Sequence, residues 1–133
     1  MTLHAHPQQL QILMCDFDRG GFRPPEMVKM RPVVVVSPKR YNATTCLVVP
    51  LSSVEPVPML PFHHRMDDAS MPRGLQGKPT WAKANMVAHV ALDRLDRPHY
   101  RSSADGRRRW EIAFCSAADW EAIRRCLRAA MGL

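Results

Sequence analysis

The chain has 133 residues, of which 46% are hydrophobic, and a formal net charge of +7. This length and composition predict one domain with a real core, and no apolar run reaches the roughly 18 residues of a membrane-spanning helix. The positive charge favours an anionic partner, a nucleic acid first and an acidic protein second.

The beginning of the chain is polar. Residues 1–11 are interpreted as a flexible tail, and residues 12–133 as the single domain, which begins with a strand over 12–17. The tail lacks the charged start and apolar core of a secretory signal, so a cytoplasmic location is expected.

Two apolar runs predict the central strands. Residues 32–37 contain four consecutive valines between two prolines, which indicates a strand buried on both faces, with Arg31 at its mouth. Residues 45–51 form a second such strand, which ends at Ser52 and Ser53. A short turn joins the two strands and predicts an antiparallel pair, which would bring Arg31 near Ser52.

The remaining elements are shorter. Strands are expected over 62–66, 80–86 and 110–114, with a loop over 67–79 and a polar basic loop over 102–109 within 97–109, while part of 87–94 fits a short helix or a turn. A helix begins after Ser116, with Asp119 in the acidic position of a capping box. The pattern is typical of a mostly β (α+β) domain, a small barrel that ends in a helix.

The sequence predicts no metal and no cofactor. The four cysteines form no C-x-x-C pair, and they are interpreted as buried thiols rather than zinc ligands. A metal site built from His63, His64 and either Asp67 or Asp68 is a weaker alternative.

Several motifs, in order along the chain, resemble the PemK/MazF toxin family. They are Cys15-Asp16-Phe17, the run from Arg31 to Pro38, Tyr41-Asn42, the run from Val48 to Ser53, and Trp81 to Met86 followed by Leu92-Asp93-Arg94-Leu95. The resemblance implies an SH3-like barrel of the CcdB/PemK/MazF type that forms a homodimer. It also implies a metal-independent endoribonuclease toxin that cleaves single-stranded RNA at short sequences and is inhibited by a cognate acidic antitoxin.

The resemblance also implies the site. The family's functional arginine and hydroxyl residue correspond to Arg31 and Ser52, the predicted catalytic pair. The planar guanidinium of an arginine matches phosphate oxygens, whereas it is a poor base. Around this pair, the residues expected to bind substrate are Ser53, Lys29, Arg23, His63, His64, Lys83, Asn85 and Trp81.

Two details keep alternatives open. His63 and His64 are adjacent on a strand, so at most one of them faces the site. Asn85 stands where some family members place an acidic residue proposed as the base, and an amide cannot take a proton. The alternative hypothesis is therefore a catalytically inert module of the same fold, either an RNA or antitoxin binder or a CcdB-like gyrase inhibitor.

Overall fold

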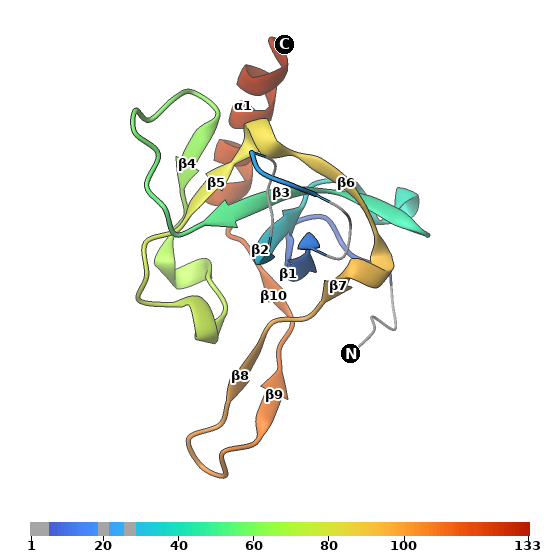
Figure 1. Ribbon diagram of the computed structural model, residues 1–133, viewed down its shortest axis with the longest axis vertical. Helices are drawn as coiled ribbons and strands as arrows, with labels where there is room; N and C mark the ends of the chain where they lie inside the picture. Colours follow the sequence, from blue (N-terminus) through green and yellow to red (C-terminus); the bar gives the residue numbers. More distant parts are fainter. Residues whose placement is uncertain (1–5, 19–21, 26–28) are drawn as a thin grey trace.

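The computed structural model describes residues 6–18, 22–25 and 29–133, and it shows a bent β-sheet packed against one helix (Figure 1). The strands and the helix are, in chain order, β1 (Gln11–Asp16), β2 (Met30–Val35), β3 (Thr45–Ser52), β4 (His63–Arg65), β5 (Trp81–Lys83), β6 (Ala88–Ala91), β7 (Leu95–Asp96), β8 (His99–Arg101), β9 (Arg108–Trp110), β10 (Ala113–Phe114) and α1 (Ala117–Met131). Short 3-10 turns lie between them: η2 (Lys39–Tyr41), η3 (Asp68–Ser70), η4 (Arg73–Leu75), η5 (Ala84–Met86) and η6 (Leu92–Arg94). The predicted mostly β domain with a C-terminal helix is confirmed.

The main sheet is antiparallel and has the order β10-β1-β2-β3-β5-β4, with β6 added on β3 and β7 on β1. Its long strand β3 pairs with β6, then with β2, and at its end with β5. Among the described residues these pairings form an open, branched path. The predicted antiparallel pairing of β2 with β3 is confirmed.

The valine run explains why two cores form. Side chains alternate across a strand, so Val34 packs with Ile12, Val49 and Ile123 of α1, while Val33 and Val35 face the second core. All three valines are fully buried, as the run without polar residues predicts.

The helix begins as expected. Ser116 caps it by accepting the Asp119 backbone N–H at 3.0 Å, and Gly132 ends it in the left-handed conformation. The Asp119 carboxylate does not complete a capping box; it bonds to η3 and β4 instead.

The tail is shorter than the sequence indicated. Leu10 donates its N–H to the Val35 carbonyl at 2.9 Å, and the buried Asn42 amide donates to the Pro7 carbonyl at 2.9 Å. The expectation of a flexible tail is thus wrong for residues 7–11, because backbone and side-chain bonds attach them to the domain. Residues 1–5 lie outside the described part of the chain.

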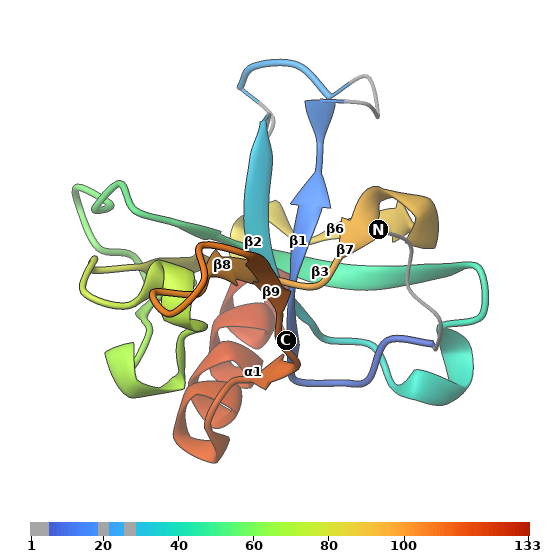
Figure 2. The ribbon, with the colours of Figure 1, turned by 90° about the horizontal axis from the view of Figure 1, so that it is seen from below.

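The segment 97–114 also differs from expectation. Residues 97–109 were expected to contain a polar loop over 102–109, but β8 and β9 pair into a hairpin that projects from the body in Figure 1 and is seen from below in Figure 2. The strand expected over 110–114 is split between β9 and β10. The hairpin escapes pattern analysis because its residues are polar or exposed on both faces, so apolar alternation is absent.

Two other boundaries change. The strand expected over 80–86 ends at Lys83, where η5 begins, and the open segment 87–94 is a strand, β6, followed by η6. All four cysteines are free and buried, as predicted. Among the described residues, no helix is long and apolar enough to cross a bilayer.

Candidate functional site

Arg31 is the second residue of β2, which lies between β1 and β3 in the main sheet. Its backbone is opposite Cys15 of β1, and the guanidinium Nε is buried with no hydrogen-bond partner among the described residues. A buried N–H without a partner is costly, so such atoms are rare outside sites that bind a ligand. The fork of Arg31 is thus suited to an anion.

Ser52 lies at the end of the neighbouring strand. Val33 is opposite Pro50, and two further residues along each strand bring Arg31 and Ser52 to matching positions, although β3 has by then turned to pair with β5. Ser52 is only 4% exposed, and its Oγ accepts the Val54 N–H at 3.1 Å. The Ser52 hydroxyl can therefore still donate a hydrogen bond to a ligand.

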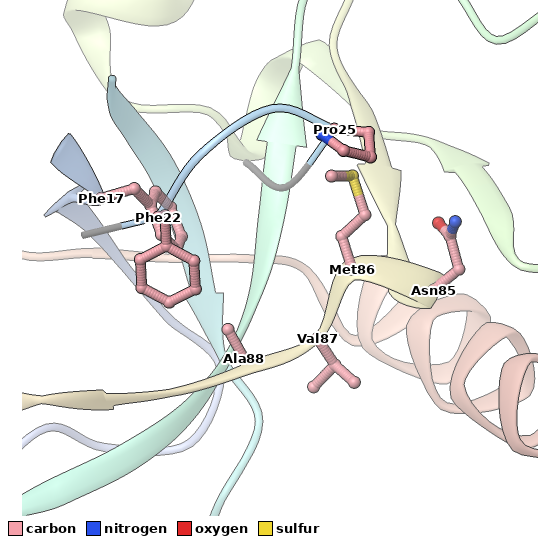
Figure 3. Close-up of a pocket in the computed structure, with 7 residues that line it drawn as sticks. All are labelled: Phe17, Phe22, Pro25, Asn85, Met86, Val87 and Ala88. Carbon is pink, nitrogen blue, oxygen red and sulfur yellow. The ribbon is translucent and has the colours of Figure 1, made fainter. Parts of the chain in front are cut away.

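A pocket of about 300 Å³ lies beside β1 and η5 (Figure 3). Its walls are mainly apolar, and the side-chain amide of Asn85 provides a polar group at its border. Phe17 and Phe22 meet edge to face in its wall, with ring centroids 5.3 Å apart. Flat apolar walls with one amide are suited to a planar, hydrogen-bonding group. The remaining lining residues are Pro25, Met86, Val87 and Ala88.

His63 and Lys83 lie opposite each other on β4 and β5. Burial, and then the charge of Lys83, lower the pKa of His63 below its ordinary value. The Nδ1 of His63 accepts the Leu60 N–H at 3.1 Å, so in the neutral ring the proton is on Nε2. His63 can thus donate a hydrogen bond, but its lone pair is already engaged.

His64 points the other way and has a structural role. Its Nε2 lies 2.8 Å from Oδ1 of Asp119, which is 3% exposed. The same carboxylate accepts the Ser70 hydroxyl at 2.6 Å and the Asp67 N–H at 3.2 Å. Burial raises the pKa of Asp119, but the hydrogen bonds from Ser70, His64 and Asp67 outweigh it and hold this pKa below its ordinary value. The ring of His64 therefore joins β4 to α1, and its expected contact with substrate stays a prediction.

Two other candidates occupy different surroundings. Trp81 was expected to bind substrate. It is 7% exposed, and the guanidinium of Arg65 lies over its ring, so little of the ring is free to stack on a base. Ser53 follows Ser52 and is exposed.

The loop before β2 carries two more of the expected cations. Lys29 and Arg23 are exposed, and the Lys29 backbone, at a φ of 76°, accepts the Phe17 N–H at 3.3 Å. Residues 19–21 and 26–28 of this loop lie outside the described part.

The weaker metal alternative has no support in the geometry. Within residues 6–18, 22–25 and 29–133, no three His, Cys, Asp or Glu side chains are grouped so that they could hold a metal ion. His64, one of the proposed ligands, is bonded to Asp119.

Comparison with known proteins identifies the family. Residues 8–131 match the family of PemK-like, MazF-like toxins of type II toxin–antitoxin systems. The chain belongs to this family. The PemK/MazF resemblance of the ordered motifs is therefore confirmed, and the match covers nearly the whole domain.

Individual relatives agree with the family match. The protein YifN of Escherichia coli (strain K12) is 34% identical over 115 residues, which cover 73% of this chain and 76% of YifN. An endoribonuclease from a mycobacterial species superposes with a TM-score of 0.65 at 17% identity, over 96% of this chain and 93% of that one. MazF from Deinococcus radiodurans gives a TM-score of 0.64 at 19% identity, over 96% and 98% of the two chains. At these identities the two superpositions establish the fold.

Two features of the region were not predicted. The buried Asp119 was read as a cap, although its spacing from Ile123 and Cys126 places it on the buried face of α1, which predicts a buried partner. Phe22 lies in a polar loop and gave no periodic signal, so only the fold shows that it lines the Asn85 pocket.

Proposed function

We propose that this toxin-family protein is an endoribonuclease that cleaves single-stranded RNA, with Arg31 as the group that binds and stabilises the reacting phosphate. The observation that supports this most directly is the Nε of Arg31, which is buried near the start of β2 and has no hydrogen-bond partner among the described residues. A guanidinium offers planar, bidentate donors to phosphate oxygens, and partial burial strengthens that interaction.

The proposed chemistry uses the RNA itself as the nucleophile and needs no metal ion. The 2′-oxygen attacks the adjacent phosphorus, the bond from phosphorus to the 5′-oxygen breaks, and the products are a 2′,3′-cyclic phosphate and a 5′-hydroxyl. The 2′-hydroxyl loses its proton to an acceptor and the departing oxygen gains one. Arg31 stabilises the developing negative charge, assisted by the Ser52 hydroxyl, and exposed Ser53 borders the same strand end.

The neighbouring side chains are proposed to hold the RNA. Lys83 and the Nε2 proton of His63 contact phosphate oxygens, and Lys29 and Arg23 attract the strand from the loop before β2. Asn85 is proposed to read the edge of a nucleobase that enters the pocket between Phe17 and Met86. Amide side chains can pair with base edges, and aromatic walls accept unstacked bases.

The proposed partners follow from charge and exposed apolar area. A cognate acidic antitoxin would compete with RNA for the basic site, and the net charge of +7 suits either anion. A second copy of this chain is proposed to cover the apolar surface around Tyr41 and Leu47, which are 66% and 40% exposed. The toxin is expected to act in the cytoplasm, where mRNA is translated.

The decisive experiment incubates purified protein with a mixed RNA in EDTA and maps the new ends. The wild type should produce 5′-hydroxyl and cyclic phosphate ends. Arg31→Ala should lower the cleavage rate by about 100-fold or more, as loss of a charge-stabilising donor does. Arg125→Ala, which removes an exposed cation of α1, is the matched control and should retain activity. Intact RNA at an excess of wild-type protein would refute the proposal.

A catalytically inert binding module is the second candidate. Two observations favour an inert module. The Ser52 oxygen already accepts the Val54 N–H, and the Asn85 amide cannot act as a base. Such a module would bind RNA or antitoxin without cutting RNA. A gyrase supercoiling assay beside the RNA assay separates a CcdB-like inhibitor from both.

A further inference from the structure

The β8–β9 hairpin, residues His99–Trp110, projects from the body as an arm, and none of the site residues above lies on it (Figure 1). His99 is opposite Trp110, and Arg101 is opposite Arg108. Residues that are directly opposite in an antiparallel pair share one face, and so do residues two apart on a strand. These four side chains therefore form one face of the arm.

The arm's other face is already engaged. Tyr100 lies opposite Arg109 there, with the Arg73 guanidinium 4.9 Å from the Tyr100 ring centroid. Arg109 is paired with Asp105 at 2.6 Å. This face therefore bonds to η4 and to its own turn.

The first face is open and repulsive. His99, Arg101, Arg108 and Trp110 are all exposed. The Arg101 guanidinium donates to the Gly106 carbonyl of the turn at 3.0 Å, the Arg108 guanidinium lies over the Trp110 ring, and neither arginine forms an ion pair in the described structure. Like charges placed directly opposite on paired strands destabilise a hairpin. An anion bound on this face would reduce the repulsion between the two exposed cations.

Rings beside cations indicate which anion fits. Trp110 meets His99 edge to face, with the centroids 6.2 Å apart, and Arg108 lies 5.9 Å from the Trp110 ring centroid. Single-stranded nucleic acids are bound by such combinations, with bases stacked on rings and phosphates on cations. An acidic peptide would use the arginines but has no bases to stack on the rings.

The arm is rooted beside Arg31. Cys15 is opposite Arg31 on one side and opposite Leu95 of β7 on the other, so two strand spacings, about 10 Å, separate the two backbones. β8 begins four residues after Leu95. We propose that the face formed by His99, Arg101, Arg108 and Trp110 is a second binding surface for single-stranded RNA, which holds the strand beyond the cleavage site. This inference takes from the proposed function only that RNA is the ligand.

Binding to an uncleavable probe tests the surface. A labelled 2′-O-methyl RNA of about 16 nucleotides, the upper end of common site sizes, is titrated by fluorescence anisotropy over a salt series. Each phosphate contact contributes about 0.7 to the slope of log affinity against log salt, so R101Q/R108Q should reduce that slope by about 1.4. Trp110→Ala should weaken binding about 10-fold through lost stacking.

R125Q/R128Q removes the same charge from exposed positions of α1 and should leave the slope near that of the wild type. R101Q/R108Q should keep the circular dichroism of the wild type. Unchanged RNA affinity and slope in R101Q/R108Q, or an equal loss in the control, would overturn the proposal. So would a loss confined to an acidic peptide probe. Cleavage is scored separately, so an inactive protein with arm-dependent binding refutes only the nuclease.

Discussion

Individual residues show how similar side chains receive different roles. His63 and His64 are adjacent, yet one lies beside Lys83 and the other is bonded to the buried Asp119. Among the described residues, the Asp119 carboxylate is bonded to the ring of His64, the hydroxyl of Ser70 and the backbone N–H of Asp67. This carboxylate therefore joins α1, β4 and η3, and it is the residue at which substitution should cost most.

Asp119→Ala should lower the free energy of unfolding by at least about 2 kcal/mol, since each buried donor left without a partner costs about 1–3 kcal/mol. Urea denaturation measures this. Glu121→Ala, which removes an exposed carboxylate paired with exposed Arg124, is the control and should change stability by less than about 0.5 kcal/mol. Equal effects of the two variants would contradict the assigned role.

The pH dependence has a defined sign. The pKa of Asp119 is lower in the folded protein than the value of about 3.9 in the unfolded chain. Its contribution is therefore complete above that value and is lost as pH falls through the lowered pKa. The stability difference between wild type and Asp119→Asn should shrink across this acid range, and a constant difference would contradict the ionised state.

At the scale of elements, strands with strong apolar patterns could be predicted, whereas the exposed hairpin of β8 and β9 could not. The four valines of 33–36 and the run of β3 identify buried strands because burial on both faces requires unbroken apolar sequence. Ser116 and Gly132 mark the ends of α1 by capping chemistry. The arm carries Arg107, Arg108 and Arg109 in succession, so its sequence shows no apolar alternation. Its two strands pair because they leave the body next to each other (Figure 1).

The candidate site was predicted only in part. Arg31 and Ser52 follow from strand ends and from the family resemblance, which locate positions along the chain. The role of Asp119 and the Asn85 pocket depend on segments far apart in sequence that the fold brings together, as with Phe17 and Met86, which line the same pocket. Periodicity carries no information about these contacts.

The core strands should keep their thiols unreactive. Burial raises the pKa of Cys15 to about 12 and that of Cys46 to about 11, and only the thiolate attacks a disulfide reagent. DTNB at pH 8 should therefore label the native protein only as fast as it unfolds, and all four thiols in guanidinium. Rapid labelling of Cys15 or Cys46 in the native protein would show that β1 or β3 opens locally.

At the scale of the whole molecule, the exposed apolar surface favours self-association. Sedimentation equilibrium should give about twice the chain mass of 15.1 kDa. Leu47→Asp should shift the protein toward the monomer while leaving its circular dichroism unchanged, because a charge at an apolar interface is costly to desolvate. Val57→Asp, at an 89% exposed position, is the control and should stay dimeric. A monomer at every concentration of wild type would exclude the homodimer.

Strand β3 pairs with three other strands, and this limits how the activity of the protein can be regulated. Since β6, β2 and β5 all depend on this one strand, loosening any of them disturbs both cores at once. A partly folded form with partial activity is therefore not expected to be populated. Control of the proposed activity is therefore best exerted from outside, through the amount of protein synthesised and the proposed antitoxin that would cover its site.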